Sequence, residues 1–413
     1  MNRRVAITGV GLLTPLGIGT SETWSAVCAG KSGIGRITRF DASSFSTQIA
    51  GEVKNFVAGD FLTKKDVKRL RLFVAYAVAA SRMAIDDSGL VIDSSNGDRV
   101  GVITGCGMGG LYEIERTSLI LNSKGPKRVS PFFIPTIIGN MAPGMISIYF
   151  GAKGPNSSVA TACAAGSHAI GSAYEIIRNG SADAMITGGV ESVISPTCIA
   201  GFNSLKALST RNDEPEKASR PFDRDRDGFI VSEGAGILLL EPLDLALERG
   251  AHVYAEIIGY GMSGDGYHMT APAPNGEGAV RCMAAAIDNA GIPSGAIDYI
   301  NAHGTSTELN DMYETQAIKT VFKEKAFDIP VSSTKSMTGH LLGASGGIET
   351  IFTALALHDG IIPPTINHDN PGEKCDLDYV PNVARKADLK IAMTNSFGFG
   401  GTNAALILKK YSI

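Results

Sequence analysis

The sequence predicts an α/β fold, and three observations support this prediction. Short runs rich in β-branched residues recur along the chain, and helical stretches separate them. Such alternation is typical of a mainly parallel sheet with helices packed on its faces. The 413 residues are 44% hydrophobic and 19% charged, a composition that can bury a large core. The predicted strands are VAITG near the start and the runs at 100–105, 158–162, 184–189, 254–261, 298–302 and 391–395.

A seam near residue 250 indicates a duplicated architecture. The segment EPLDLALERG ends a helix with Arg249 and Gly250, which is a typical C-terminal pattern. The segment AHVYAEIIGYGMSGDG then restarts a strand and turn that are similar to the first residues of the chain. We therefore expect two halves, at 1–250 and 251–413.

Net charge and cysteine spacing exclude several classes of protein. The 37 basic and 41 acidic residues leave a formal charge of -4, so no global field attracts nucleic acid or an anionic membrane. The six cysteines lack the CxxC spacing of a zinc or dithiol site, and they fit a reducing cytoplasm. No stretch approaches the roughly 18 continuous apolar residues that a membrane span requires. We expect a cytoplasmic protein without membrane insertion.

Two patterns imitate binding loops but depart from them at decisive positions. Residues 223–228 open like a calcium-binding loop, but Gly234 stands where the closing acid is needed. Residues 105–110 match GxGxxG after a strand, but no acidic residue ends a following strand about 20 residues further on. We expect neither calcium nor a dinucleotide at these loops.

Cys163 lies at a junction where a cysteine can become a nucleophile. A strand ending near Ala162 runs into a helix that closes with Arg178 and Gly180. A cysteine at the start of a helix meets the positive end of the helix dipole, which favours the thiolate. A buried structural cysteine is an equally good interpretation of this segment alone.

Two histidines lie in loops that follow predicted strands. His303 occurs in NAHGTST after the strand DYINA, and His340 occurs in SSTKSMTGHLLGASGG after the strand at 329–332. The carboxyl ends of strands are where an α/β sheet gathers its reacting groups. A cysteine with two such histidines predicts acyl transfer followed by a step that needs two further donors or bases. His168, five residues after Cys163, is expected to point elsewhere from its helix.

Four motifs together give the sequence a family resemblance. The chain contains TACAAG, NAHGTST followed by Asp311 and Glu314, KSMTGHLLGASG and NSFGFGGTN. In order and spacing they resemble the β-ketoacyl-acyl carrier protein synthases, particularly the type II elongating enzymes of bacterial fatty acid synthesis. The resemblance spans nearly the whole chain. It implies a thiolase-type fold, in which duplicated βαβαβ-containing halves form a five-layered α/β/α/β/α body, normally as a homodimer.

The resemblance implies a decarboxylative condensation in two half-reactions. The thiolate of Cys163 would attack an acyl thioester on acyl carrier protein, and the backbone N–H groups of Cys163 and Phe399 would stabilise the oxyanion. Malonyl-acyl carrier protein would then lose carbon dioxide. His303 and His340 would hold the oxygen of the resulting enolate, and no cofactor would be required for catalysis.

The resemblance also assigns charged and polar residues around this centre. Lys335 would pair with Glu314 and order the charges near the histidines, although an ordinary loop salt bridge is the alternative. A structural sodium, potassium or magnesium ion would lie in a buried site without a catalytic role. The residues that map onto this cation site are Asn301, Glu349 and Ser396.

Other positions resemble the family's substrate contacts. Thr305 and Thr307 would hydrogen-bond the phosphopantetheine arm of the carrier protein. Glu308 departs from the family pattern, in which proline is frequent, and this leaves the contacts of the arm open. Met108 and Phe399 would line or gate the acyl pocket, where core packing is the alternative. The candidate substrate-binding residues are Thr305, Thr307, Met108 and Thr270.

A basic run offers a docking site for the acidic carrier protein. The run is dense in lysine and arginine, with Asp66 as its single acidic residue, so its local field can steer an acidic partner despite the negative net charge. A solvated helix face is the alternative. The residues of the run are Lys64, Lys65, Lys68, Arg69 and Arg71, and Lys206 and Arg211 are expected to contribute from a surface loop.

Four competing functions differ from this interpretation at particular residues. A thiolase uses a second cysteine near its C-terminus, but NSFGFGG contains none and Cys375 lies outside any glycine-rich motif. Starter-unit synthases use Cys, His and Asn, whereas this chain has a second histidine at His340. A non-catalytic chain-length partner subunit lacks the nucleophile, so Cys163 argues against that role. A polyketide ketosynthase remains an open alternative.

Overall fold

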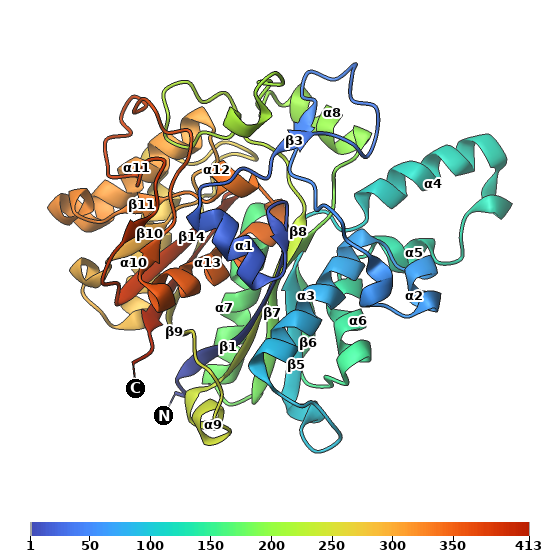
Figure 1. Cartoon of the computed structure of the whole chain (residues 1–413), viewed down its shortest axis with the longest axis horizontal. Helices are drawn as coiled ribbons and strands as arrows, with labels where there is room; N and C mark the ends of the chain where they lie inside the picture. Colours follow the sequence, from blue (N-terminus) through green and yellow to red (C-terminus); the bar gives the residue numbers. More distant parts are fainter. Residues whose placement is uncertain (1, 413) are drawn as a thin grey trace.

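An eleven-stranded sheet runs through residues 2–412, which a computed structural model describes (Figure 1). Its strands are β1 (Val5–Thr14), β2 (Gly17–Ile18), β5 (Val100–Gly105), β6 (Asn156–Val159), β7 (Ala184–Glu191), β8 (Gly234–Pro242), β9 (Ala255–Gly264), β10 (Tyr299–Asn301), β11 (Val331–Ser332), β14 (Ile391–Gly398) and β15 (Thr402–Lys410). The spatial order is β1-β8-β7-β5-β6 in the first half and β9-β15-β14-β10-β11 in the second half. If the five strands in each of these orders are numbered by their position along the chain, the two halves have the same strand order. Strand β1 pairs with β9 where the halves meet.

The sheet is mixed, so the prediction of a mainly parallel sheet is wrong. Among the main strands of residues 2–412, parallel pairs occur within β5-β6-β7 and within β10-β11-β14, and the other pairs are antiparallel. One cause is a tight turn: β14 ends at Gly398 and β15 begins at Thr402. A connection this short can join only antiparallel strands.

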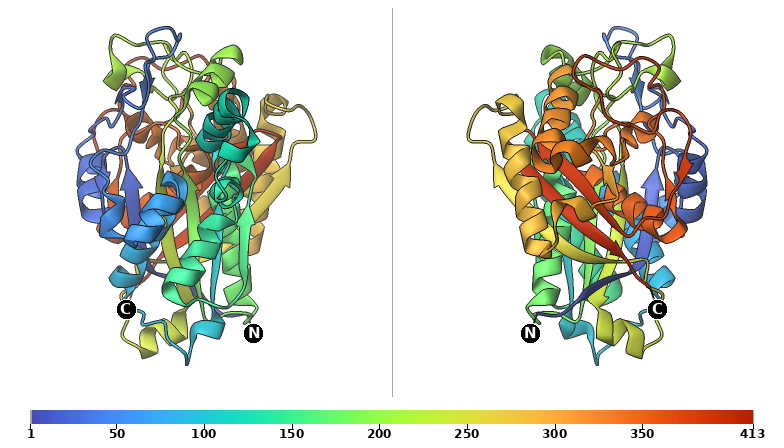
Figure 2. Two further views of the ribbon diagram at one scale, coloured as in Figure 1. Left: turned by 90° about the vertical axis from the view of Figure 1, so that its right-hand side faces the viewer. Right: turned by 90° about the vertical axis from the view of Figure 1, so that its left-hand side faces the viewer.

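Helices form three layers around the two halves of the sheet (Figures 1 and 2). Two helices, α7 (Ala165–Arg178) and α13 (Ser345–Asp359), lie side by side in the middle and contact strands of both halves. The outer layers contain α3 (Leu72–Ser88) and α6 (Met141–Phe150) on the first half, and α10 (Glu277–Ala290) and α11 (Glu308–Phe322) on the second half. The predicted α/β/α/β/α arrangement of duplicated halves is confirmed. The boundary between 250 and 251 stays a prediction.

Shorter elements surround this frame. The remaining helices are α1 (Thr20–Cys28), α2 (Lys64–Arg69), α4 (Leu111–Lys124), α5 (Phe133–Ile137), α8 (Pro196–Ser204), α9 (Leu243–Glu248) and α12 (Lys335–Thr338). The remaining strands are β3 (Gly35–Arg36), β4 (Ile49–Ala50), β12 (Ile361–Ile362) and β13 (Arg385–Lys386). None of the described helices has both the length and the apolar composition needed to cross a membrane.

Glycine lets the backbones of the central layer approach one another closely. A Cβ atom at Gly346, in α13, would lie 2.4 Å from the backbone nitrogen of Ser167, in α7. A Cβ atom at Gly166 would lie 2.8 Å from the backbone nitrogen of Gly347. Packed interiors leave no room for a side chain at such distances. The first turns of α7 and α13 therefore lie against each other, together with the loops that precede them.

The same strained turn precedes both central helices. A 3-10 turn lies before α7 (η4, Ala162–Ala164) and another before α13 (η9, Leu342–Ala344). The first residue of each turn has a φ of +49°, which residues other than glycine rarely adopt. Such strain persists where the surrounding structure enforces it, and it is concentrated at functional sites. Cys163 follows the strained residue in the first half, and Gly343 follows it in the second.

Helices α4 and α5 project from the body as an arm, at the right of Figure 1. Large apolar side chains on this arm are exposed, although isolated chains seldom leave so many in one region. The edge strand β6 lies at one end of the sheet, and its first two residues are exposed. The exposed apolar residues of the arm are Tyr112, Ile114, Leu119, Leu121, Phe132 and Ile134.

Candidate active site

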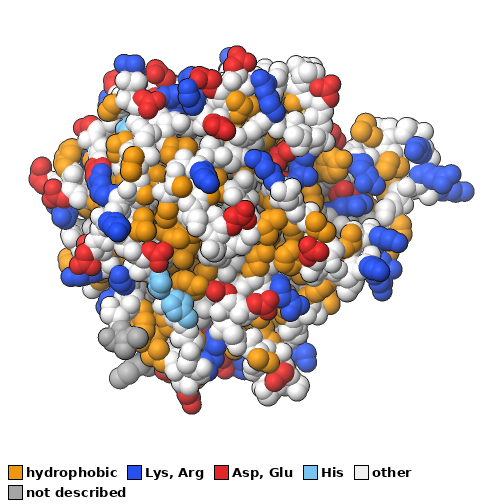
Figure 3. All heavy atoms as spheres, viewed as in Figure 1, with side chains coloured by type: hydrophobic (Ala, Val, Ile, Leu, Met, Phe, Trp, Pro, Cys, Tyr) orange, Lys and Arg blue, Asp and Glu red, His pale blue; other side chains and the backbone are white. Residues whose placement is uncertain are grey.

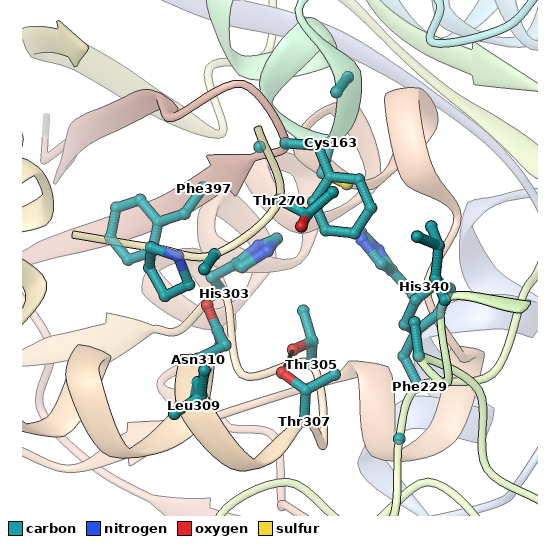
Figure 4. Close-up of a pocket in the computed structure, with 18 of the residues that line it drawn as sticks. Cys163, Phe229, Thr270, His303, Thr305, Thr307, Leu309, Asn310, His340 and Phe397 are labelled. Atoms are coloured by element: carbon teal, nitrogen blue, oxygen red, sulfur yellow. Dashed lines mark hydrogen bonds between the residues drawn. The ribbon is translucent and has the colours of Figure 1, made fainter. Parts of the chain in front are cut away.

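A cavity of about 540 Å³ opens where the two halves of the chain meet. Its wall includes Cys163 from the turn before α7, His303 from the loop after β10 and His340 from the loop before α13. Figure 4 shows these three side chains converging on the same space. The structure therefore brings together the three residues that the sequence singled out for chemistry.

Cys163 is buried, and its surroundings act on the sulfur in opposite directions. Burial raises the pKa of the Cys163 thiol to about 12. The charge of Lys335 and the backbone N–H groups of Phe399 and Cys163 lower the same pKa, but by less. Burial thus outweighs the influence of the helix dipole that the sequence indicated, because α7 begins only at Ala165 and the thiol lies in an apolar cluster. The resting centre is a neutral thiol that faces groups able to stabilise negative charge.

The two histidines are neutral partners of this thiol. The rings of His303 and His340 lie edge to face, with their centroids 5.4 Å apart. Burial lowers the pKa of both histidines well below the usual value, and the positive charge of Lys335 lowers both further. The Nδ1 atom of His340 lies 3.0 Å from the Oγ atom of Ser345. A neutral ring carries one N–H group, and when Nδ1 of His340 accepts from the Ser345 hydroxyl, the N–H of that ring lies on Nε2, where it can meet an oxygen atom of a substrate.

Lys335 forms an ion pair, but with a different acid from the predicted one. Its Nζ atom contacts Glu349, and both side chains are almost fully buried. Glu314 instead accepts hydrogen bonds from the backbone N–H groups of His303, at 2.8 Å, and Gly304, at 2.7 Å. Burial raises the pKa of Glu314 and of Glu349 to about 7. Glu314 thus holds the loop that carries His303, and Glu349 balances the buried lysine.

The candidate substrate contacts line the same cavity. Thr305 and Thr307 lie beside each other, with their hydroxyl oxygens 2.9 Å apart. Glu308, at the family's proline position, begins α11 and also borders the cavity. Arg226 donates a hydrogen bond of 3.0 Å to the carbonyl oxygen of Glu308 and thereby fixes this corner. The remaining predicted contacts that line the cavity are Met108, Thr270 and Phe399.

The three candidate cation ligands are buried near the central layer. The Oδ1 atom of Asn301 and the Oε2 atom of Glu349 have no hydrogen-bond partner among the described residues. The Oγ atom of Ser396 already lies 2.8 Å from that of Ser167. Oxygen ligands are the ones that sodium, potassium and magnesium prefer, so two of the three residues fit. In residues 2–412 no cluster of three His, Cys, Asp or Glu residues forms a metal site.

Glu191 is a residue of this site that the sequence analysis missed. Its carboxylate accepts hydrogen bonds from the backbone N–H groups of Gly107, Met108 and Gly343, at 2.7, 3.2 and 3.1 Å. Burial raises the pKa of Glu191, although these three donors oppose the change. The residue ties the loop that carries Met108 to the turn before α13. An acid at the end of the apolar strand AMITGGVE was the available signal.

The predicted docking residues gather on α2, beside the arm. Lys64, Lys65 and Lys68 are exposed. Arg69 places its guanidinium 4.7 Å from the centre of the Phe132 ring, next to α5. Figure 3 shows basic side chains on this side of the molecule, over the arm and over the helices beside it.

Comparison with known proteins gives matches along the whole chain. A family model described as "Beta-ketoacyl synthase, N-terminal domain" matches residues 2–246, and one described as "Beta-ketoacyl synthase, C-terminal domain" matches residues 254–369. The curated 3-oxoacyl-[acyl-carrier-protein] synthase 2 of Synechocystis sp. is 53% identical over 409 residues, which cover 99% of this chain and 98% of that protein. The protein of the same name from Coxiella burnetii is 53% identical over 408 residues, which cover 99% of both chains.

A solved structure extends the comparison to three dimensions. It is described as a type II PKS acyl-carrier protein in complex with its ketosynthase bound to the hexaketide. The match covers 100% of both chains, with a TM-score of 0.92 and 34% sequence identity. The fold described above is thus shared with a ketosynthase.

Replacing Lys335 by methionine should raise the pKa of the Cys163 thiol, because the lysine charge lowers that pKa. At a fixed pH below the pKa, each unit of increase reduces the thiolate fraction by about tenfold. Alkylation of Cys163 by iodoacetamide, which requires the thiolate, should slow accordingly when measured between pH 7 and 10.

The variant Lys335→Met leaves Glu349 without its partner, so Lys335→Met/Glu349→Gln is the control for an unpaired buried acid. We expect slower alkylation in both. A wild-type alkylation rate in both folded variants would contradict the assigned influence of Lys335 on the sulfur.

Proposed function

Because the chain belongs to the β-ketoacyl synthase family, we propose that it elongates fatty acids by condensing acyl-acyl carrier protein with malonyl-acyl carrier protein. The reaction yields β-ketoacyl-acyl carrier protein and carbon dioxide, so the chain is an acyltransferase. The convergence of Cys163, His303 and His340 on one cavity is the observation that carries this proposal. The 53% identity to curated 3-oxoacyl-[acyl-carrier-protein] synthases 2 favours fatty acids over polyketides, since the polyketide ketosynthase is 34% identical.

In the first half-reaction, the sulfur of Cys163 attacks the carbonyl carbon of the acyl thioester. A bond forms between sulfur and the acyl carbon, and the phosphopantetheine thiol of the carrier leaves with the proton that Cys163 loses. Negative charge develops on the carbonyl oxygen. The N–H groups of Cys163 and Phe399, which already lower the pKa of the resting thiol, are the donors for that oxyanion. One such donor typically contributes about 3 kcal/mol to transition-state stabilisation.

In the second half-reaction, the malonyl group loses carbon dioxide, and its thioester oxygen becomes an enolate oxygen. His303 and His340 donate N–H groups to this oxygen, and burial together with Lys335 keeps both rings neutral at pH 7. The enolate carbon attacks the acyl carbon on Cys163. A carbon-carbon bond forms, the carbon-sulfur bond breaks, and Cys163 leaves as a thiolate that takes a proton from solvent. Lys335 also favours each anionic stage through its charge.

Hydroxyl groups along the cavity are suited to the carrier arm. Thr305 and Thr307 offer two neighbouring hydroxyls, and Thr270 offers a third from the segment that follows β9. Short hydroxyl side chains can both donate to and accept from the amide groups of phosphopantetheine. Met108 and Phe399 supply apolar surface near Cys163 for the acyl chain.

Acyl carrier protein is the partner of this reaction, and α2 is its proposed docking site. A ketosynthase of the same fold is known in complex with an acyl carrier protein. The exposed amines of Lys64, Lys65 and Lys68 and the guanidinium of Arg69 give this surface a positive field. Such a field speeds the encounter with an acidic partner.

The exposed arm supports a homodimer. Apolar side chains of α4 and α5 and the open edge of β6 are features that a second copy of the chain would cover. Detection of only the single-chain mass by sedimentation at micromolar concentration would contradict the homodimer.

Catalysis needs no cofactor in this proposal, and a bound cation has a structural role. The unpaired oxygens of Asn301 and Glu349 are the atoms that would hold sodium, potassium or magnesium. Removal of these ions should then lower the melting temperature, and an unchanged value would contradict the site.

A reducing cytoplasm is the proposed location. The six cysteines are free thiols in the described structure, so this part of the chain does not depend on an oxidising compartment. Recovery of the protein outside the cytoplasmic fraction of its cell would contradict this location.

Replacing His303 by alanine should separate the two half-reactions. Transfer of a labelled acyl group to the protein should stay largely intact, since the oxyanion donors are unchanged. Release of carbon dioxide from malonyl-acyl carrier protein and condensation should fall by about 100- to 1000-fold, as is typical when one such donor is removed. Cys163→Ala should abolish condensation. Normal condensation by His303→Ala would contradict the role of that histidine.

Reversing charges on α2 should weaken carrier docking without altering the chemistry. We expect Lys64→Glu/Lys65→Glu/Lys68→Glu to raise KM for acyl-acyl carrier protein by roughly tenfold at low salt, and by less as salt screens the field. Its rate with carrier-free acyl pantetheine should be unchanged. Lys386→Glu/Lys390→Glu/Lys409→Glu, which reverses three exposed lysines on the second half, is the matched control. Equal effects of the two variants would exclude α2 as the docking site.

A further inference from the structure

We propose that His168 is a positioning residue that holds the two oxyanion donors, one from each half of the molecule, at a fixed separation. The inference rests on the proposed function, because it concerns the oxyanion hole, the site at which the N–H groups of Cys163 and Phe399 would bind the oxyanion. His168 does not line the cavity, in agreement with the expectation that it points elsewhere. Its ring nevertheless contacts the segments that carry both donors.

The ring of His168 makes two hydrogen bonds with defined directions. Its Nε2 atom lies 3.2 Å from the carbonyl oxygen of Asn403, and its Nδ1 atom lies 2.7 Å from the Oγ1 atom of Thr161. A carbonyl oxygen can only accept, so Nε2 carries the proton. In the neutral ring Nδ1 then accepts from the hydroxyl of Thr161. Burial lowers the pKa of His168, which favours the neutral form that this pattern needs.

The two partners of His168 flank the two donors. Thr161 lies two residues before Cys163, and Asn403 lies four residues after Phe399. The Oγ1 atom of Thr402 also donates to the carbonyl oxygen of Thr161, at 3.1 Å. The glycine-rich turn between β14 and β15 is thereby fastened to the segment that presents the nucleophile.

The segment next to Thr161 has a strained backbone at Ala162, so it needs contacts that keep it in place. Ala162 adopts a φ of +49°, a conformation that costs a non-glycine residue about 1 to 3 kcal/mol. A Cβ atom at Gly398 would lie 2.8 Å from the carbonyl oxygen of Thr161, so the turn and the strained segment already touch. Release of Thr161 would let the backbone of Ala162 relax. The N–H of Cys163 would then move relative to that of Phe399.

The duplicated architecture provides an internal comparison. The strained residues Ala162 and Leu342 are equivalent, so the residue equivalent to His168 is Ile348. Both side chains are buried. The turn of the second half carries Gly343 in place of the nucleophile. The helix that follows it has the apolar side chain of Ile348 where α7 has His168. Of these two equivalent positions, only the one in the half that carries Cys163 is a histidine.

Two reaction rates measured on the complete enzyme test this role. Alkylation of Cys163 by iodoacetamide needs the thiolate but no oxyanion hole, whereas acyl transfer from acyl-acyl carrier protein needs both. The ratio of acyl transfer to alkylation at one pH cancels the thiolate fraction and reports the oxyanion donors. A displacement of catalytic groups by about 1 Å can cost roughly 100-fold in rate. We expect His168→Leu to lower the ratio by about 10- to 100-fold.

Further variants separate the two hydrogen bonds. Thr161→Val removes one hydroxyl without changing the shape of the side chain, and it should also lower the ratio. His168→Gln can direct an amide N–H towards Asn403, and it should restore part of the ratio that His168→Leu loses. Tyr174→Phe is the matched control, because it removes another hydrogen bond from α7 to the second half, between Tyr174 and the carbonyl oxygen of Ile258. This control should keep the wild-type ratio.

The outcomes distinguish this inference from the proposed function. Wild-type protein that transfers no acyl group would refute the proposed function itself. Wild-type protein that acylates, together with an unchanged ratio in folded His168→Leu and Thr161→Val, would overturn the role of His168. An equally reduced ratio in Tyr174→Phe would also overturn it, because the effect would then be general loosening of α7. If His168→Leu does not fold, Thr161→Val and His168→Gln still decide between these outcomes.

Discussion

The close approach of α7 and α13 is the constraint on which the active centre depends. Backbone atoms of one helix occupy the space that a side chain of the other would need at Gly166 and Gly346, so the helices start side by side. The turn before each helix is consequently pressed against its counterpart. The nucleophile comes from one turn and His340 from the loop that leads into the other. A duplicated fold thus yields an asymmetric site, in which one copy of the turn carries Cys163 and the other carries Gly343.

A second constraint is electrostatic and arises from the charge of Lys335. This buried cation is balanced by Glu349, and it lowers the pKa of Cys163, His303 and His340. For the histidines, burial and the lysine charge both lower the pKa, so both rings remain neutral donors. For the cysteine, burial raises the pKa while the lysine charge lowers it by less. The resting thiol therefore stays protonated until a substrate carbonyl can accept the charge. Lys335 therefore keeps the histidines neutral in the resting enzyme, and it favours the negative charge that develops from the cysteine only during the reaction.

The sequence predicted the fold class and the three central residues because motifs encode them locally. It did not predict strand direction, since short β-branched runs look alike in parallel and antiparallel pairs. The family resemblance paired Lys335 with Glu314 instead of Glu349, because a motif does not reveal which of two acids faces a buried lysine. The sequence analysis missed the contacts of Glu191 and His168, whose partners Gly343 and Asn403 lie 152 and 235 residues away. Such contacts exist only after the two halves pack.

The covalent intermediate is the step at which the buried thiol, the oxyanion donors and the carrier substrate all meet. Its most direct measurement is peptide mass spectrometry of the intact enzyme after incubation with acyl-acyl carrier protein alone, without malonyl substrate. One added acyl mass on the peptide that contains Cys163, lost again when malonyl-acyl carrier protein is supplied, is the predicted result. An unmodified Cys163 peptide, or an acyl group on another of the six cysteines, would contradict Cys163 as the nucleophile.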